Sequence, residues 1–427
     1  MRLKPLLLFA FLAPLFMATE CLCGGDCSRN NNKNANTNQN ANSNGNANVN
    51  QNTNQNANAN VNRNANANSN ADAKKLAVAA GVVIAGAAPG TSNPALAFDG
   101  QGHLNLFYQT STKTPGHLFE RAQMNADGTW TNPAPAAPEF QYLNSLDLLP
   151  DPSGRLCMLW SGSQYDSNGN SVYGLYRNCQ KTDGTWTADA MPAAATSTAA
   201  TFSVSRAATG VLRAVYISQG VLFFSPIENQ GTVVLTGTQL SANNGDVLLA
   251  RLAIDSNGGY HAAWTESTGG SSAFTVQQRD SSDGGKTWGL ARKLYSGSAD
   301  NPASISFELA ADAAGQAHLA WDADLGIWYS RWTAVGGWGA PVKLSGDAQA
   351  MGVSLAVTKG GLARAVWSSI GTSETVVLAV QTLGGAWGLP QTVSPTRGYE
   401  QALAVDAQGT SHVVWRADDG LRYLAVP

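Results

Sequence analysis

Two arginines, a tyrosine and three carboxylates lie near the carboxyl end of this chain and could together bind a polar ligand. They are Arg397, Tyr399, Glu400, Arg416, Asp418 and Asp419. Guanidinium groups pair with anions, a phenol ring offers a flat face for stacking, and carboxylates accept hydrogen bonds. This set is our first candidate site. The alternative is loop charge that contacts only solvent.

Large aromatic residues that recur along the chain form a second candidate set. They are Tyr108, Trp160, Tyr216, Trp264, Trp321, Trp367 and Trp415. Their rings could form a series of stacking platforms for sugars. The four that we take as ligand-binding candidates are Trp264, Trp321, Trp367 and Trp415. The alternative is packing in the core, because large aromatic side chains dominate buried area.

Polar residues recur three positions before each aromatic. They are Asn105, Cys157, Arg213, His261, His318, Arg364 and His412. With one such residue in each repeat, the side chains would not converge at the roughly 2 Å that a zinc site requires. We therefore expect no metal and no other cofactor, and we interpret these residues as buried hydrogen-bonding groups that contact a neighbouring repeat.

Five cysteines occur, an odd number that leaves at least one outside any disulfide. Cys157 and Cys179 are expected on neighbouring strands of one repeat, where an oxidising compartment would permit a disulfide. Whether they are bridged stays open at this point. The other three, Cys21, Cys23 and Cys27, follow directly on an apolar amino-terminal segment.

Seven copies of one unit position these side chains. The clearest copies read LAIDSNGGYHAAW, LAADAAGQAHLAW and LAVDAQGTSHVVW, and the aromatic positions lie 46 to 57 residues apart. Each copy predicts a strand a, a DxxG turn, a strand b, a variable loop, a strand c, a Gly-Trp turn and a strand d. Short strands with a glycine and aromatic signature in each repeat are typical of a β-propeller. We therefore predict an all-β fold of seven four-stranded blades.

The ring is expected to close between its two ends. The last copy stops one strand short of a blade, after LRYLAVP. Residues 76–86, LAVAAGVVIAG, precede the first strand a in the way that a strand d precedes it elsewhere. We predict that this segment pairs with the strand that contains Leu421 and Tyr423, which removes exposed sheet edges.

One complete turn motif lies between strands c and d of the fourth repeat, where the chain reads SSDGGKTW. It resembles the Asp box, or BNR motif, of sialidase-like propellers. The residues that match are Ser281, Asp283, Gly285, Thr287 and Trp288. Shortened relatives end at Trp130, Trp186, Trp338 and Trp387. We expect a structural role, with Asp283 a buried acceptor of turn N–H groups and Gly285 at positive φ.

The resemblance implies a fold more strongly than an activity. Sialidases of this family carry an arginine triad, a tyrosine nucleophile with a glutamate partner, and an aspartate acid, and their first arginine lies in an FRIP-like segment. Between Ala73 and Arg155 this chain has only Arg121, and no such segment. We therefore favour a chain that is not an enzyme, with a ligand on the face of the b–c and d–a loops. An exo-sialidase-like glycoside hydrolase is the alternative.

Composition excludes some partners. Charged residues make up 13% of the chain and the formal net charge is −3, so no basic field exists to hold nucleic acid. Residues 1–18 contain Arg2, Lys4 and an apolar run, the pattern of a secretory signal peptide that is too short to span a bilayer. We expect export to a secreted or cell-surface location and no transmembrane span. A lipid anchor at Cys21 is an alternative to simple cleavage.

Residues 19–72 contain the first three cysteines and an asparagine-rich segment, with asparagine at every even position from Asn30 to Asn70. Such sequence cannot bury enough apolar area to fold, so we predict a disordered tether. The period of two also fits asparagine ladders in a cross-β assembly. The propeller would occupy residues 73–427.

Three functions fit these features. A monomeric, non-catalytic binding propeller for a glycan or protein ligand is the reading that we favour. A sialidase-type glycoside hydrolase and a structural surface or matrix protein are the alternatives.

Overall fold

The computed structural model describes residues 81–427, apart from 85–90, 112–116, 138–139, 141, 166–170, 187–198, 228–236, 243–245, 269–271, 300–304, 347, 372–373 and 395. The predicted signal peptide, the tether and Cys21 lie outside the described residues. These features, the domain boundaries and the cellular location therefore remain predictions.

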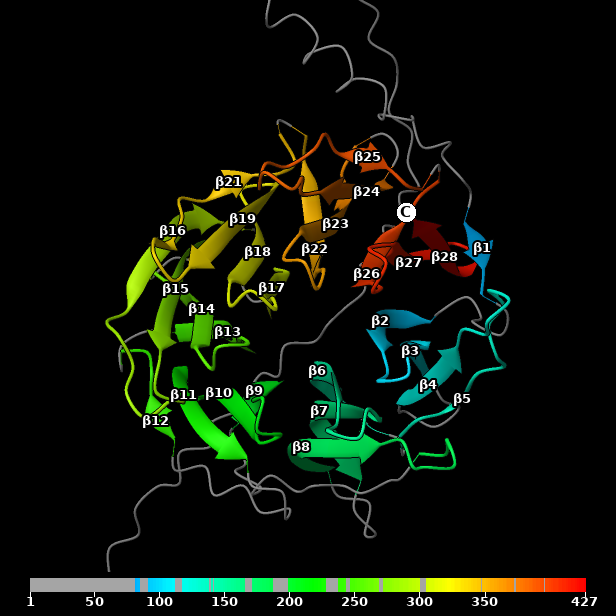
Figure 1. Ribbon diagram of the computed structural model, residues 1–427, viewed down its shortest axis with the longest axis horizontal. Helices are drawn as coiled ribbons and strands as arrows, with labels where there is room; N and C mark the ends of the chain where they lie inside the picture. The colour runs from blue at the N-terminus through cyan, green and yellow to red at the C-terminus, as the bar shows by residue number, and fades with distance from the viewer. Residues whose placement is uncertain are drawn as a thin grey trace, which may run out of the picture. The chain divides into compact units, whose positions relative to one another are not determined.

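The described strands form seven antiparallel sheets arranged in a ring (Figure 1). Blade 1 contains β2 (Ser92–Phe98), β3 (Leu104–Ser111), β4 (His117–Gln123) and β5 (Ala134–Pro135). Blade 2 contains β6 (Tyr142–Pro150), β7 (Leu156–Tyr165) and β8 (Ser171–Cys179). Blade 3 contains β9 (Ala199–Arg206), β10 (Leu212–Ser218), β11 (Val221–Ile227) and β12 (Thr238–Gln239). Blade 4 contains β13 (Asp246–Ile254), β14 (Tyr260–Ser267), β15 (Ala273–Ser281) and β16 (Arg292–Ser298).

The remaining blades follow the same order. Blade 5 contains β17 (Phe307–Ala311), β18 (Ala317–Ala323), β19 (Gly326–Thr333), β20 (Gly337–Trp338) and β21 (Val342–Lys343). Blade 6 contains β22 (Ala350–Val357), β23 (Ala363–Ser369), β24 (Thr375–Val380) and β25 (Gln391–Thr392). Blade 7 contains β26 (Tyr399–Val405), β27 (Ser411–Ala417), β28 (Gly420–Val426) and β1 (Val82–Val83).

Two blades vary the four-stranded plan. In blade 5 the outer position is shared by β20 and β21, which both pair with β19. In blade 2 three strands, β6, β7 and β8, lie among the described residues. The all-β fold of seven blades is otherwise as predicted.

The ring closes as expected, through a strand from the amino-terminal side. Val82 pairs with Tyr423 and Val83 pairs with Arg422, and the Ile84 N–H donates to the Leu421 carbonyl at 2.9 Å. The innermost strand of blade 7, β26, also contacts the innermost strand of blade 1, β2. Blade 7 is therefore built from both ends of the folded part of the chain.

Strand b of each blade is buried on both of its faces. All residues of β27 except Arg416 are buried, and β14, β18 and β23 have similar patterns. These strands are rich in Ala, Val, Leu and Trp because a neighbouring blade packs against each face of the sheet. The core thus consists of seven layers between blades.

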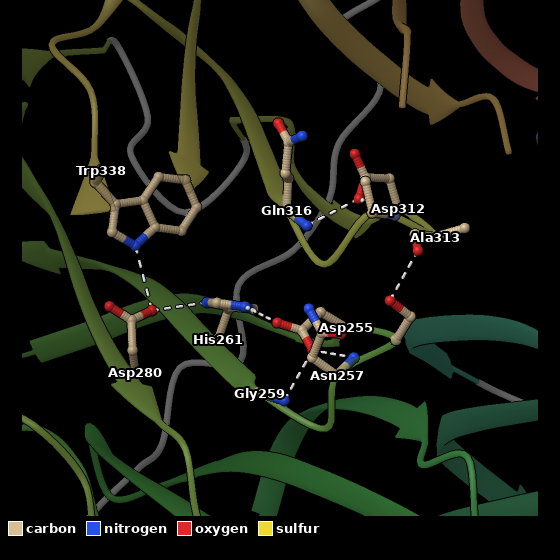
Figure 2. Close-up of polar contacts among 11 residues, drawn as sticks. Asp255, Asn257, Gly259, His261, Asp280, Asp312, Ala313, Gln316 and Trp338 are labelled. Carbon is tan, nitrogen blue, oxygen red and sulfur yellow. Dashed lines mark hydrogen bonds and ion pairs between the residues drawn. The ribbon is translucent and has the colours of Figure 1, made fainter. Parts of the chain in front are cut away.

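The loops between strands define two faces of the ring. The a–b and c–d turns lie on one face, which we call the lower face, and the b–c and d–a loops lie on the other, the upper face. In the a–b turn of blade 4, Asp255 accepts hydrogen bonds from the N–H groups of Asn257 and Gly259, both at 2.8 Å (Figure 2). Such local side-chain bonds satisfy the turn backbone and fix the hairpin.

Candidate functional site

The recurring aromatics at the end of strand b lie in the core. The exposed fractions of Trp264, Trp321, Trp367 and Trp415 are between 0 and 2%. The interpretation of these four tryptophans as stacking platforms is therefore wrong. They are buried because the adjacent blades pack on both faces of strand b, which leaves no ring face for a sugar.

The histidines three residues earlier make buried hydrogen bonds to side chains of their own blades, and the network of His261 extends to the next blade. His261 Nδ1 lies 2.8 Å from Asp280 Oδ1, and His261 Nε2 lies 3.2 Å from Asp255 Oδ2 (Figure 2). Trp338 of the next blade donates to the same Asp280 oxygen at 3.3 Å. Among the described residues no group of three or more His, Cys, Asp or Glu side chains could hold a metal ion.

The segment Ser281–Trp288 is a closed polar turn on the lower face. Asp283 Oδ1 accepts from the N–H groups of Lys286 at 3.0 Å and Thr287 at 2.9 Å, and Oδ2 accepts from the Thr287 hydroxyl at 2.6 Å. These bonds, the Thr287 hydroxyl first, lower the pKa of the Asp283 carboxyl to about 2. Asp283 is exposed, so the expectation of a buried acceptor is wrong: Ser281 and Gly285 are the buried residues of this turn, and the carboxylate lies on its solvent side.

The first candidate set is split between two places on the upper face. Arg397, Tyr399, Glu400 and Arg416 lie together, whereas Asp419 pairs with Arg422 through an Oδ2 to Nη2 contact of 2.5 Å. Asp418 is exposed in the b–c turn of blade 7. Neither aspartate lines the cavity described below.

The Tyr399 ring lies beside two guanidinium groups. The Cζ atoms of Arg397 and Arg416 are 5.5 and 5.1 Å from the ring centroid. Each arginine also has a carboxylate partner: Arg397 Nε is 2.5 Å from Glu374 Oε2, and Arg416 Nη1 is 3.0 Å from Glu400 Oε1. The result is a polar surface with one aromatic face, held in place by ion pairs.

A strained β-bulge in β26 sets the direction of the side chains in this cluster. The register of β26 against β27 shifts between Tyr399 and Ala402, and Glu400 has φ of 47°. A positive φ is costly for a residue with a side chain, and bulges of this kind redirect side chains. Glu400 Oε2 accepts the Asn93 N–H at 3.1 Å, and Asn93 itself has φ of 51° in the bulge of β2.

The cluster borders a cavity of about 410 Å³ between blades 5, 6 and 7, which we call the upper pocket. Its lining includes Asp322, Met351, Tyr399, Glu400 and Gln401. Gln401 Nε2 donates to the Gly352 carbonyl, and Ser368 Oγ donates to Gln401 Oε1 at 2.8 Å. The pocket therefore combines an apolar side chain with fixed carboxylate, amide and phenol groups.

Asp322 is a pocket residue that the sequence did not single out. Its Oδ1 accepts the Ser306 N–H at 2.9 Å and its Oδ2 accepts the Gly352 N–H at 2.8 Å. Burial raises the pKa of this carboxyl to about 6, although the two backbone bonds act in the opposite direction. Asp322 directly follows Trp321, as Arg416 follows Trp415, and this position after the buried aromatic was the signal available in the sequence.

A second cavity, of about 560 Å³, lies among the innermost strands of blades 1, 2, 5, 6 and 7. Asp147, Glu308 and Glu400 line it. Burial raises the pKa of Asp147 to about 6, while nearby Arg251 and the Val204 N–H, whose bond is 2.8 Å long, lower it. Glu400 thus lines both this second cavity and the upper pocket.

Comparisons with known proteins identify the fold. The chain is similar to the structure of a polysaccharide lyase PL25, an ulvan lyase bound to -[GlcA(1-4)Rha3S]-, with a TM-score of 0.55, 12% identity, and 81% of this chain and 96% of that chain covered. The shared feature is the fold. No protein-family model matches the chain, and no curated protein matches it either.

Two further solved structures are similar to the chain with lower scores. The NanB sialidase from Streptococcus pneumoniae gives a TM-score of 0.42 at 12% identity, with 81% of this chain and 70% of that chain covered. A protein of unknown function from Dyadobacter fermentans gives 0.43 at 13% identity, with 81% and 96% covered. Within the described part of the chain, no helix is long and apolar enough to cross a membrane.

Proposed function

We propose that this protein is a secreted or surface-tethered propeller that binds a glycan, without catalysis, in the upper pocket. The observation that carries the proposal is the Tyr399 ring, which lies beside two guanidinium groups at the border of a cavity of about 410 Å³. Sugars present apolar C–H faces and many hydroxyl groups. An aromatic face with convergent polar groups suits both features.

The shared fold and the expected location of the protein support a glycan over other polar ligands. The polysaccharide lyase whose fold this chain shares was solved with a disaccharide repeat bound. An oxidising, extracytoplasmic location fits the Cys157–Cys179 disulfide and the predicted signal peptide. Fold alone does not fix chemistry, so the argument rests on the pocket side chains.

A binding role is favoured over hydrolysis because Arg121 and Asp322 are already engaged in hydrogen bonds within the protein. Arg121, the arginine nearest the start of the propeller, donates to Asn105 Oδ1 at 2.8 Å and to Gln123 Oε1 at 2.5 Å within blade 1. Both carboxylate oxygens of Asp322 accept backbone N–H groups, so this residue serves to hold Ser306 and Gly352.

Glycan-array screening of the full chain, followed by calorimetry on the best ligand, tests the proposal. Tyr399→Ala should weaken binding by about tenfold or more, whereas Tyr399→Phe, which keeps the ring, should bind nearly as well. Arg416→Ala should also weaken binding, and Arg292→Ala, at an exposed arginine of blade 4, is the matched control. Equal affinity of the wild type and Tyr399→Ala would show that the pocket is not the glycan site.

The sialidase-type hydrolase remains the second candidate, because a carboxyl with a pKa raised to about 6 lies in the same pocket as a tyrosine and a glutamate. Hydrolysis of a fluorogenic sialoside separates the two functions. We expect no turnover above background. Turnover that disappears in Tyr399→Phe would replace the binding proposal with the hydrolase.

A structural surface or matrix role predicts neither activity. It would be supported if no glycan on the array bound and no sialoside were cleaved. The glycan-binding proposal would then be withdrawn.

A further inference from the structure

A further cavity, with a different chemistry, lies on the lower face between blades 2 and 3. Its volume is about 310 Å³. Four cationic side chains line it together with one carboxylate, and we call this group the basic pocket. Its members are Asp151, Arg155, Arg177, Lys181 and Arg206. Four positive charges against one negative charge is an unusual concentration in a chain whose net charge is −3.

The single carboxylate does not neutralise the basic pocket. Asp151 Oδ2 pairs with Arg155 Nη2 at 2.6 Å. Among the described residues no ion pair engages Arg177, Lys181 or Arg206, although Lys181 lies near enough to the Asp183 carboxylate to interact with it electrostatically. The pKa of Arg206 is lowered, chiefly by burial; Asp151 acts against this, and the charge of Arg177 lowers it further, so two guanidinium groups lie close enough to repel.

One donor in the basic pocket has no acceptor. Arg206 Nη1 donates to the Gly210 carbonyl at 2.9 Å, but Arg206 Nε is buried and makes no hydrogen bond among the described residues. Leaving a buried charged donor unpaired is costly, typically by more than a neutral one. A ligand in the pocket that supplies oxygen acceptors and negative charge would relieve the repulsion between Arg206 and Arg177.

A disulfide holds the cations in position. Cys157 and Cys179 face each other across β7 and β8 and are joined by a bond that lines the pocket. Arg155 lies two residues before Cys157, and Arg177 and Lys181 lie two residues before and after Cys179. The charged groups are thus attached to a covalently linked pair of strands, which limits the entropy lost when a ligand binds.

Blade 2 differs here from blades 4, 5 and 7. Cys157 occupies the position of His261, His318 and His412, each of which contacts the turn aspartate of its own blade at 3.2 to 3.3 Å. Those networks pair a histidine with a carboxylate inside a blade. In blade 2 the turn carboxylate of Asp151 pairs instead with Arg155, and the remaining cations border the cavity.

We propose that the basic pocket binds a tetrahedral oxyanion, the sulfate or phosphate ester group of a larger molecule. Such a group offers several acceptor oxygens to guanidinium groups that approach from both blades, and it carries the charge that the pocket lacks. This site lies on the face opposite the upper pocket and does not depend on the glycan proposal.

Calorimetry on the full chain, with inorganic sulfate and phosphate as probes at constant ionic strength, tests the proposal. We expect saturable binding of one anion per chain, weakened at least tenfold by Arg206→Gln and by Arg177→Gln. Arg292→Gln, at an exposed arginine of blade 4, should bind as the wild type does. If Arg206→Gln does not fold, as judged by loss of its melting transition, Lys181→Gln at an exposed position takes its place.

Glucose 6-sulfate, glucose 6-phosphate and glucuronate distinguish the sources of the anion. Tighter binding of the sulfate ester would assign a sulfated ligand, and tighter binding of the phosphate ester a phosphorylated one. Equal or tighter binding of glucuronate would overturn the tetrahedral assignment. No saturable binding of either inorganic anion, or equal binding by the Arg206 and Arg292 variants, would overturn the site itself.

Discussion

At the residue scale, Asp322 makes the pH dependence of stability a test of the upper pocket. Because the folded-state pKa is raised from the ordinary value of 3.8 to about 6, the native state retains a proton that the unfolded state loses. The stabilisation is fully present below about pH 4 and is lost as the pH rises through 6. By the usual conversion the loss is on the order of 3 kcal/mol or less.

Thermal melts of the wild type and Asp322→Asn between pH 3.5 and 8 measure this effect. The asparagine cannot ionise, so the difference in melting temperature, wild type minus variant, should fall between pH 4 and pH 6.5 and then stay level. Asp283→Asn, measured down to pH 2, is a useful comparison, because the pKa of Asp283 is lowered to about 2 and its contribution is lost as the pH falls from about 4 towards 2. A difference for Asp322 that does not change with pH would contradict the assigned burial.

At the element scale, the c–d turns position one blade against the preceding one. The Trp288 ring lies 5.1 Å from Phe224 of blade 3, and a methyl group on Gly285 would lie 2.4 Å from that phenylalanine. Trp130, Trp186 and Trp387 make equivalent contacts with Tyr423, Phe107 and Tyr329 of their preceding blades. The turns therefore act as contacts between blades as well as links between strands.

Substitutions at Gly285 and Gly184 distinguish the backbone conformation that such a turn requires from its packing against the preceding blade. Both have positive φ, 85° and 82°, but nothing lies near the position of a methyl group on Gly184. Gly184→Ala should cost about 1–2 kcal/mol from the backbone alone. Gly285→Ala should cost roughly 2–5 kcal/mol, because the methyl group also clashes with Phe224. Equal losses in urea denaturation would show that the contact between the blades contributes nothing.

The disulfide gives a second test at this scale. Cys157 and Cys179 are separated by 22 residues, and closing a loop of that length stabilises a fold by roughly 3 kcal/mol in the chain-entropy account. A double Cys157→Ala, Cys179→Ala variant should melt at a lower temperature than the wild type. A reductant should lower the melting temperature of the wild type and leave that of the double variant unchanged. A response of both proteins would point to the other cysteines.

At the scale of the whole molecule, ring closure depends on a short strand from the amino-terminal side. Gly81 packs so closely on Trp415 that a methyl group there would lie 2.5 Å from the indole, and β1 covers the outer edge of β28. Removal of residues 73–86 should therefore lower the melting temperature and promote association through the exposed edge of β28.

A chain that lacks residues 30–70 is the matched control for this deletion, because the low-complexity segment is predicted to add nothing to the core. It should melt as the wild type does and remain monomeric in light scattering. If both deletions left melting and association unchanged, closure by β1 would not matter for stability.

The architecture of this protein could be predicted from its amino-acid sequence. The period of about 50 residues, the strand-turn-strand pattern in each copy and the missing last strand sufficed to predict seven blades and their closure by residues 76–86, within which residues 82 and 83 form the pairs. These features are local or repeated seven times, so they can be read without knowing which residues meet in space. The placement of Cys157 opposite Cys179 follows from the same register.

Which side chains form a site depends on how the blades pack against one another. The recurring tryptophans were candidates for ligand binding from the sequence, but they are buried, since a strand b between two blades has no free face. The residues after two of them, Asp322 and Arg416, reach the region of the upper pocket, because successive side chains on a strand point to opposite sides. Their chemistry then depends on partners from other blades.

The pKa of Asp322 and the surplus charge of the basic pocket are properties of this packing. Asp322 is held by Ser306 and by Gly352 of the adjacent blade, and Arg206 meets Arg177 across the junction of blades 2 and 3. The residues that bury Asp322 or place one charge beside another lie 16 to 30 residues apart in the sequence. Spacing along the chain carries no information on such distances, so these two pockets became visible only in the folded ring.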